Sequence, residues 1–398
     1  MALTETRAAT EPVALVHDYL TQLGGAERVA LSMARAFPEA ALYTSFYDPA
    51  HTYPGFGKVD VRPMALNRSP LLRGHFRAAL PVMAPAFSAL RPPASVTLCS
   101  SSGWAHGVNP AGRKVVYCHA PARWLYQASR YLGGLAGGIP APGGRHDATD
   151  RLAPRLASRS RELAARGALG ALGSALRSWD RRAAASAHRY LANSTATAWA
   201  VRSAYGIEAE VLPPPPALHP GGAERAPGAI EPGFWLCVAR LLPYKNVDVV
   251  MAAVARLGDE LVVVGDGPDR ARIRQLAGPG VHVLGAVGDE ELRWCYRRCR
   301  GLVAASYEDY GLTPLEAASF GKPSAVLRWG GFLDTVVEDR TGVFFDDPEP
   351  EAVAQALRRL DHLALSPQTL VDHAAGFGEE QFRRRLREIV AEELALAG

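Results

Sequence analysis

The chain has 398 residues, of which 48 % are hydrophobic and 21 % are charged, and its formal net charge is +4. At roughly 100–200 residues per domain, this length predicts two domains, and the composition excludes a chain that is disordered throughout. The charge is too mild to indicate a nucleic-acid-binding protein, but it suits an anionic ligand or a membrane surface. The sequence contains no run of about 18 apolar residues, the length that a membrane-spanning helix needs.

Short apolar runs recur in both halves of the chain, and each is followed by a segment with helical periodicity. Continuous apolar runs are typical of strands that are covered on both faces, and strand–helix alternation indicates parallel sheets. The predicted strands cover residues 13–16, 95–99, 114–118, 189–192, 234–238, 260–264, 281–284, 301–304, 324–327 and 342–345. We therefore predict an α/β fold with two Rossmann-like domains.

A proline-rich segment separates the two groups of strands. Four consecutive prolines occupy residues 213–216, and residues 220–233 are rich in Gly and Pro. Such a segment suits a stiff linker, because proline cannot sit in a central strand. We place the N-terminal domain at residues 1–214, the linker at 215–232 and the second domain at 233–379. Ligands of such sheets lie beyond the carboxyl ends of the strands, so the expected site is the cleft between the domains.

Two stretches of the first half differ from their surroundings. Residues 131–144 include six Gly and two Pro, which predicts a mobile loop. Residues 145–189 hold ten Arg and four acidic residues, with Leu at near-helical spacing. One interpretation is a pair of solvated Arg-rich helices. The other is a basic surface for an anionic membrane or a lipid-phosphate acceptor.

Five cysteines are scattered along the chain. Cys295 and Cys299 are four residues apart on a predicted helix, but no second Cys or His pair lies near them, so zinc-ligand spacing is lacking. Reduced thiols in a cytosolic protein are the better interpretation. We expect a cytoplasmic location, with peripheral attachment to the inner face of the membrane as the alternative.

Two short motifs follow predicted strands and could bind an anion. Gly24 and Gly25 follow the first strand and open a helix, where glycine lets the backbone approach an anion and the helix N-terminus offers free N–H groups. Arg240 and Lys245 follow the first strand of the second half, five residues apart across a proline turn. Such a pair could clamp a diphosphate, although a solvated loop would carry the same residues.

A stronger local pattern covers residues 307–317. Glu308 and Glu316 are eight positions apart, with one carboxylate before a turn and the other inside a predicted helix. Between them, Tyr310, Gly311 and Leu312 offer backbone N–H groups to an anion or to a sugar hydroxyl. A glutamate that points inward from a helix is costly unless it is paired or binds a ligand. Two surface carboxylates would be the alternative.

His119 directly follows a predicted strand of the first half. A single histidine is more often a structural residue than a ligand-binding one. Its position at the carboxyl end of a strand nevertheless favours a role in the site.

In this order along the chain, these segments resemble the family 4 retaining glycosyltransferases of GT-B fold. Glu308 and Glu316 match that family's E-x7-E signature. Arg240 and Lys245 match its diphosphate-binding pair, and Gly24 and Gly25 match its N-terminal glycine loop. His119 matches the histidine beside the donor sugar, and Val287 lies in the nucleobase-facing loop. It further implies that a C-terminal helix at residues 380–398 returns to complete the N-terminal domain.

The resemblance implies a mechanism in which the protein acts without a metal ion or other cofactor. Arg240 and Lys245 would neutralise the leaving diphosphate, together with the amides of residues 310–312. Glu308 would orient the sugar hydroxyls, Glu316 would bind the ribose diol, and His119 would hold the donor sugar near its C6 hydroxyl. The anomeric configuration would be retained, and domain closure would exclude water.

The resemblance is strongest to bacterial enzymes of surface-polysaccharide or O-antigen assembly. The implied donor is a nucleotide-diphosphate sugar, with GDP-mannose as the best guess, and the acceptor is a glycan, a lipid-linked molecule or a small molecule. One departure is Tyr310, where Phe is usual in the family. The alternatives are a catalytically inactive GT-B binding protein and a GT-B-like sugar-nucleotide epimerase or phosphorylase.

Overall fold

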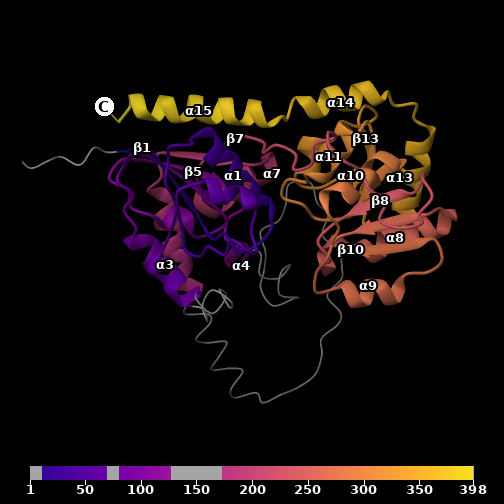
Figure 1. The fold of residues 1–398 in the computed structure, drawn as a ribbon, viewed down its shortest axis with the longest axis horizontal. Coiled ribbons are helices and arrows are strands. Elements are labelled where there is room, and N and C mark those ends of the chain that lie inside the picture. Colours follow the sequence, from indigo (N-terminus) through magenta and orange to yellow (C-terminus); the bar gives the residue numbers. More distant parts are fainter. Residues whose placement is uncertain (1–10, 70–79, 127–172, 398) are drawn as a thin grey trace, which may run out of the picture. The chain divides into compact units, whose positions relative to one another are not determined.

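The computed structural model describes residues 11–69, 80–126 and 173–397 (Figure 1). The chain divides into two compact units, which we call the first and the second unit. The first unit comprises residues 1–193, 197–212 and 383–398, and the second comprises residues 194–196 and 213–382. The change from one unit to the other at residues 212–213 falls at the start of the proline run. The predicted Gly-rich loop at 131–144 lies outside the described residues, as does most of the predicted Arg-rich stretch.

The first unit is built on a parallel sheet with the strand order β3-β2-β1-β4-β5-β6-β7. Its strands are β1 (Glu11–His17), β2 (Leu42–Thr44), β3 (Val61–Pro63), β4 (Ala94–Ser101), β5 (Arg113–Cys118), β6 (Arg189–Ala192) and β7 (Glu210–Val211). The predicted strands of this half are confirmed, whereas β2, β3 and β7 were not predicted. These three have only two or three residues each, too few for an apolar run to stand out.

Helices cover the sheet of the first unit (Figure 1). They are α1 (Gly25–Ala36), α3 (Leu80–Ala89), α4 (Arg123–Tyr126), a helix at residues 173–185, most of α7 (Thr195–Tyr205) and most of α15 (Glu379–Ala395). In α15, Leu386, Ile389 and Val390 are buried, and Arg385 forms an ion pair with Glu210 of β7 at 2.7 Å. The C-terminal helix is therefore an integral part of the first unit.

The second unit is built on a parallel sheet with the order β10-β9-β8-β11-β12-β13. Its strands are β8 (Trp235–Val238), β9 (Leu261–Val264), β10 (Val281–Gly285), β11 (Gly301–Ala304), β12 (Ser324–Leu327) and β13 (Gly342–Phe345), and all were predicted. Its helices are α8 (Val247–Leu257), α9 (Arg270–Leu276), α10 (Asp289–Arg298), α11 (Thr313–Ser319), α12 (Phe332–Thr335), α13 (Pro350–His362) and α14 (Pro367–Ala375).

Helix α8 illustrates how the pattern of the sequence produces this packing. Val247, Val250 and Val254 recur at helical spacing, so they lie on one face, and all three are buried. They share a hydrophobic core with Leu261 and Val263 of β9. Complete burial of a side chain of this kind contributes about 1.5–3 kcal/mol, which fixes the helix on the sheet.

The strand order of each sheet reverses at one point. In the first unit the reversal lies between β1 and β4, and in the second it lies between β8 and β11. Ligands of open parallel sheets bind beyond the carboxyl ends of the strands at such a switch point. The predicted α/β fold with two Rossmann-like sheets is therefore confirmed, while the predicted cleft between them stays a prediction. None of the described helices is long and apolar enough to cross a membrane.

Candidate functional site

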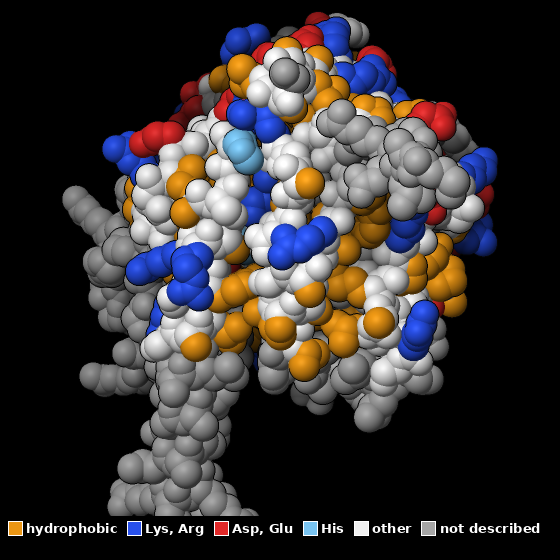
Figure 2. Space-filling model, turned by 90° about the vertical axis from the view of Figure 1, so that its left-hand side faces the viewer, with side chains coloured by type: hydrophobic (Ala, Val, Ile, Leu, Met, Phe, Trp, Pro, Cys, Tyr) orange, Lys and Arg blue, Asp and Glu red, His pale blue; other side chains and the backbone are white. Residues whose placement is uncertain are grey.

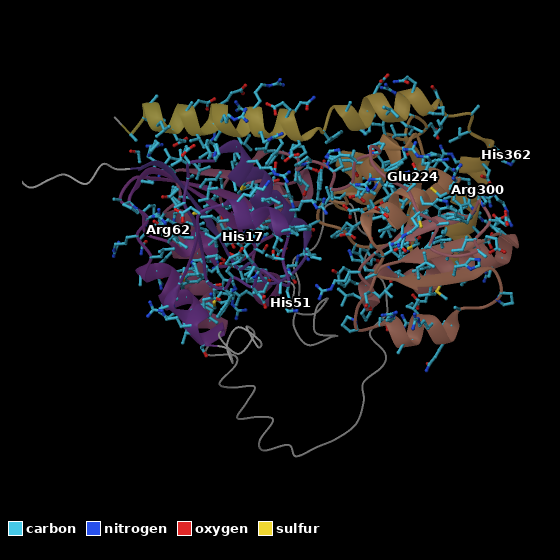
Figure 3. The ribbon with its side chains drawn as sticks, in the orientation of Figure 1. His17, His51, Arg62, Glu224, Arg300 and His362 are labelled. Atoms are coloured by element: carbon cyan, nitrogen blue, oxygen red, sulfur yellow. The ribbon has the colours of Figure 1, made fainter. Side chains whose placement is uncertain are left out.

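At the switch point of the first unit, three polar side chains form a hydrogen-bonded chain. His17 is the last residue of β1, Ser100 lies near the end of β4, and His119 directly follows β5. His17 Nδ1 lies 3.0 Å from Ser100 Oγ, and Ser100 Oγ lies 2.8 Å from His119 Nε2. Figure 3 labels His17 within this unit. Sequence reasoning identified His119 and missed its two partners.

Both histidines are buried, and burial lowers the pKa of each ring. Desolvation lowers the pKa of His17 to about 4, although the backbone carbonyl of Ser100 partly opposes the shift. Desolvation also lowers the pKa of His119 to about 3, and electrostatic interactions with His17 and Arg123 add to the effect. Both rings are therefore neutral at pH 7, so the two histidines offer uncharged donors and acceptors.

Asp18, the next residue after His17, shapes the end of β4. Its carboxylate accepts the backbone N–H groups of Ser102 at 2.7 Å, Trp104 at 3.2 Å and Ala105 at 2.6 Å. Desolvation nevertheless raises the pKa of Asp18 to about 6. Asp18 thus binds the turn that follows β4 and acts as a structural residue beside the histidines.

The predicted glycine loop opens α1, as expected, but it has an acidic neighbour. Gly24 is the N-cap residue of α1, and Gly25 is its first helical residue. A Cβ atom added to Gly24 would collide with the carboxylate of Glu27, which is buried and accepts a hydrogen bond from Gln22 at 2.8 Å. Any other residue at position 24 would therefore displace the Glu27 carboxylate, whether or not the loop binds an anion. The predicted ligand contacts of Gly24 and Gly25 stay predictions.

At the switch point of the second unit, the structure brings Lys245 and Glu308 into direct contact. Lys245 ends a short 3₁₀ turn (Pro243–Lys245) after β8, and Glu308 follows β11. The Lys245 ammonium donates a hydrogen bond to Glu308 Oε1, which also accepts one from Ser306 Oγ at 3.0 Å. The Lys245 side chain is only 9 % exposed. Two of the predicted residues thus form a charged pair at the expected edge of the sheet.

Asn246 explains why the loop after β8 lies against the loop after β11. Its backbone is left-handed, with φ at 51°, and its side-chain amide donates a hydrogen bond to the carbonyl oxygen of Ala305 at 2.8 Å. Asn is among the few residues that tolerate this conformation. Arg240, on the same loop, is exposed, and it has neither a hydrogen bond nor an ion pair among the described residues.

The turn at residues 308–312 is supported by glycines from both sides. Gly331 donates its N–H to the carbonyl oxygen of Glu308 at 2.9 Å, and a Cβ atom on Gly331 would collide with the backbone of Tyr310. Gly311 itself has φ at 79°, which favours glycine. The turn then leads into α11, with Leu312 as its N-cap residue. The backbone of this turn is therefore held firmly at the start of a helix.

Glu316 lies inside α11, and its carboxylate is satisfied within the protein. It is buried and accepts hydrogen bonds from the Tyr296 hydroxyl at 2.7 Å and from the backbone N–H of Ala217 at 3.2 Å. This pairing meets the cost of an inward glutamate without a ligand. Tyr296 gave no signal in the sequence because it lies on another helix.

The remaining predicted residues take different places. Val287 follows β10 and is partly buried against the core near α10. Tyr310 is buried, and its hydroxyl lacks a hydrogen-bond partner among the described residues. Desolvation raises the pKa of this phenol, and the negative charge of Asp334 raises it further. The structure therefore places Lys245 and Glu308 together, whereas Glu316 and Val287 occupy separate positions in the same unit.

Comparison with known proteins connects this geometry to a family. Residues 233–362 match the family model described as Glycosyl transferases group 1. The chain is similar to the glycogen synthase of Thermus thermophilus, with 30 % identity over 213 residues, 48 % of this chain and 49 % of that protein. It is also similar to a GDP-mannose-dependent alpha-(1-6)-phosphatidylinositol monomannoside mannosyltransferase of Mycobacterium tuberculosis, with 31 % identity over 174 residues, 39 % of this chain and 45 % of that protein.

The chain spans about half the length of the curated relatives it matches. Solved structures cover more of it. The crystal structure of HepE from Anabaena in complex with UDP and glucose superposes with a TM-score of 0.65 at 15 % identity, over 96 % of this chain and 99 % of that one. A likeness at this identity supports the fold. The chain therefore has the two-sheet GT-B fold, and residues 233–362 of its second unit match the glycosyl transferases group 1 model.

Proposed function

We propose that this protein is a retaining glycosyltransferase that moves a hexose from a nucleotide-diphosphate sugar to a glycan, a lipid-linked molecule or a small molecule. The observation that carries the proposal is the contact between Lys245 and Glu308, which joins the loops after β8 and β11. This contact lies at the switch point of the sheet that matches the family. Retention of configuration rests on the resemblance to the family 4 enzymes.

The proposed chemistry at this edge is electrostatic. Departure of the diphosphate from the sugar builds negative charge on the leaving oxygens, and a pre-positioned cation stabilises that charge. Lys245 has three N–H donors, so its contact with Glu308 leaves donors for a phosphate. Arg240, five residues earlier in the chain, is exposed and can bind a diphosphate as a fork. We propose that these two cations and the amides of residues 310–312 take the place of a metal ion.

The remaining predicted residues complete the proposed donor site. Glu308 orients hydroxyls of the sugar, Glu316 binds the ribose, and Val287 faces the nucleobase. In the first unit, His119 recognises the donor sugar. Tyr310 contributes its backbone amide, because its hydroxyl is buried.

For the donor we propose GDP-mannose. Support comes from the name of the M. tuberculosis relative, which states that it depends on GDP-mannose. The alternative is a UDP-sugar, since HepE was crystallised with UDP and glucose. The nucleobase separates these two donors, so the free nucleotides can be compared directly.

Thermal unfolding with GDP, UDP, ADP and dTDP tests this proposal. A ligand at 100 times its Kd should stabilise the protein by about 2.7 kcal/mol. We expect GDP to raise Tm most, with and without EDTA, and Lys245→Ala to reduce the shift. Lys58→Ala, which changes an exposed lysine of the first unit, should leave the shift intact.

Each other outcome of that experiment has a definite meaning. A shift that EDTA abolishes would contradict metal independence. A larger shift with UDP would replace the proposed donor. If no nucleotide stabilises the protein, the proposal fails and the inactive binding protein becomes the better interpretation.

We further propose that the protein works at the cytoplasmic face of a membrane and reaches a lipid-linked acceptor there. In the face drawn in Figure 2, hydrophobic side chains gather in the lower half, with Lys and Arg among them. In the helix at residues 173–185, Leu176 and Ala184 are buried while Arg177, Arg181 and Arg182 are exposed. An apolar surface with surrounding cations suits anionic lipid headgroups.

Vesicle pelleting tests the membrane proposal. We expect binding to phosphatidylglycerol-containing vesicles at low salt, release at high salt, and little binding to phosphatidylcholine alone. Replacing Arg177, Arg181 and Arg182 by Gln should weaken binding. Replacing Arg340 and Arg358, exposed arginines of the second unit, should weaken it less. Absence of binding at low salt would refute the proposal.

A further inference from the structure

The histidine–serine–histidine chain of the first unit is held by three neighbouring strands. His17 of β1 is in register with Ser100 of β4, and Ser101 of β4 is in register with Cys118 of β5. The backbone N–H of His119 donates to the carbonyl oxygen of Ser101 at 2.9 Å. The three side chains therefore occupy fixed positions, and their protons can be assigned from the hydrogen bonds they form.

The proton of His17 is assigned first. Its Nδ1 atom lies 3.2 Å from the carbonyl oxygen of Ser100, which can only accept a hydrogen bond. Nδ1 must therefore carry a proton. The ring is neutral at pH 7, because burial lowers its pKa to about 4. Its other nitrogen, Nε2, is consequently unprotonated and can only accept.

The proton of Ser100 follows from that assignment. The Nδ1–H group of His17 also lies 3.0 Å from Ser100 Oγ, so this oxygen accepts from His17. The single hydroxyl proton of Ser100 then goes to His119 Nε2, 2.8 Å away. In the reverse arrangement, His119 would donate from Nε2 and the buried hydroxyl of Ser100 would have no acceptor among the described residues, which is unfavourable.

The proton of His119 is assigned in the same way. Its Nε2 atom accepts, and the ring is neutral because burial, with help from His17 and Arg123, lowers its pKa to about 3. Its proton therefore lies on Nδ1. Within the described part of the chain, neither His119 Nδ1 nor His17 Nε2 has a hydrogen-bond partner, and neither is among the fully buried unpartnered atoms. The hydrogen bonds of the chain thus leave both nitrogens available to a ligand.

We propose that His17 and Ser100 are positioning residues that lock His119 as a hydrogen-bond donor through Nδ1, while His17 offers Nε2 as an acceptor. The pair is neutral, so it selects hydroxyl groups, which both donate and accept, over phosphate oxygens at neutral pH, which chiefly accept. This inference rests on the proposed function and assigns to this edge of the sheet the recognition of a sugar's hydroxyls. In the proposed function, the diphosphate is bound by the cations of the second unit.

Tautomers can be read directly in the free protein. Long-range ¹H–¹⁵N spectra of ¹⁵N-histidine-labelled protein near pH 7.5 distinguish protonated from unprotonated ring nitrogens. The variants His17→Asn and His119→Asn assign the two signals by their loss. We expect both rings to be protonated on Nδ1. In Ser100→Ala, His119 should shift towards Nε2–H, and Ser100→Thr, which keeps a hydroxyl, should restore Nδ1–H.

A wild-type His119 that is protonated on Nε2 would overturn the inference, as would a His119 tautomer that Ser100→Ala leaves unchanged. Circular dichroism and thermal unfolding check that each variant is folded. If Ser100→Ala does not fold, the wild-type spectrum alone still decides the tautomer.

Enzyme kinetics test whether the Nδ1–H group of His119 contributes to substrate binding and turnover. The amide nitrogen of Asn can take the place of Nδ1, whereas that of Gln reaches the place of Nε2. We therefore expect His119→Gln to lower kcat/KM about tenfold more than His119→Asn, as for the loss of one hydrogen bond. Equal activities, or a more active Gln variant, would refute the role of Nδ1 in ligand binding.

The spectra separate this inference from the proposed function. They are recorded without a nucleotide, so they are valid even if no nucleotide binds. If GDP or UDP stabilises the protein but His119 carries its proton on Nε2, the inference alone fails. If no nucleotide binds but both rings carry Nδ1–H, the tautomer assignment is confirmed. The proposed recognition of a donor sugar by these rings is then refuted.

Discussion

Among the described residues each unit buries one lysine, and the two lysines have different partners. Lys114 of β5 donates to the carbonyl oxygens of His106 at 2.7 Å, Val108 at 3.1 Å and Ala183 at 3.2 Å, and to a serine hydroxyl. All of these partners are neutral, and burial lowers the pKa of Lys114. The partner of Lys245, by contrast, is the carboxylate of Glu308.

The two lysines are both buried, but their partners differ in kind. Lys114 uses its donors to join the turn after β4 to the end of the helix at residues 173–185, so it stabilises the fold. Lys245 is held by a carboxylate on the edge where an anion would bind. The ion pair with Glu308 holds the Lys245 ammonium in place at this edge. Burial alone therefore does not identify a functional lysine; its partners do.

The largest expected effect comes from Lys245→Ala. Removing one donor that stabilises developing charge lowers kcat by about 100- to 1,000-fold. Steady-state transfer assays with the donor identified by the nucleotide panel measure it, and Lys58→Ala is the matched control. A folded Lys245→Ala variant with wild-type turnover would contradict the proposed role of Lys245 in stabilising the diphosphate. The two lysines would then not differ in function.

Lys114→Met should have the next largest effect, on stability. The substitution fills a similar volume but removes the Lys114 hydrogen bonds to three carbonyl oxygens and a hydroxyl, so we expect a loss of about 2–4 kcal/mol in the free energy of unfolding. Urea unfolding followed by circular dichroism measures it. If Lys245→Ala destabilised the protein more than Lys114→Met, Lys114 could not be distinguished as the structural lysine.

Acid should destabilise the first unit through its neutral histidines. The folded-state pKa values of His17 and His119 are about 4 and about 3, below the value of 6.5 for a free histidine. The unfolded chain therefore binds more protons below pH 6.5, and stability is lost as pH falls from 6.5 towards 4. Each ring contributes up to about 1.4 kcal/mol per pH unit.

Asp18 opposes part of this loss, because its pKa is raised to about 6 and the folded state binds its proton more tightly. Urea unfolding at a series of pH values measures the net slope. His119→Asn should flatten the curve between pH 6.5 and 4. An unchanged slope in that variant would mean that His119 is not buried as a neutral ring.

Tyr310→Phe should have the smallest effect. The Tyr310 hydroxyl is buried and lacks a partner among the described residues, so its removal relieves a desolvation cost. We expect a gain of up to about 1 kcal/mol in the free energy of unfolding, measured as a rise in Tm. A loss of stability would show that the hydroxyl has a partner, and the turn of the second unit would then be held by more than backbone contacts.

Much of the fold could be predicted from the sequence. The continuous apolar runs predicted every strand of the second sheet, because such strands are covered on both faces. The prediction failed for β2, β3 and β7, whose two or three residues carry no periodic signal. The proline run at residues 213–216 predicted a change of unit that the structure places at residue 213.

The site was less accessible to sequence reasoning. Arg240, Lys245 and Glu308 stood out because they lie in loops that follow apolar strands, at the edge where ligands of parallel sheets bind. The sequence could not indicate that Glu316 is satisfied by Tyr296, or that Glu27 packs on Gly24. These partners come from other helices or side-chain conformations, so no local spacing encodes them.

The sequence by itself determined the α/β class, most of the strands and the charged residues of the second unit, because burial periodicity and residue type are local properties. Only the tertiary structure decided the strand order, the pairing of Lys245 with Glu308 and the chain from His17 through Ser100 to His119. Those features depend on register between strands that are up to 83 residues apart in the chain. Proton positions and partners are set by that register, and the register is set by the packing of the whole unit.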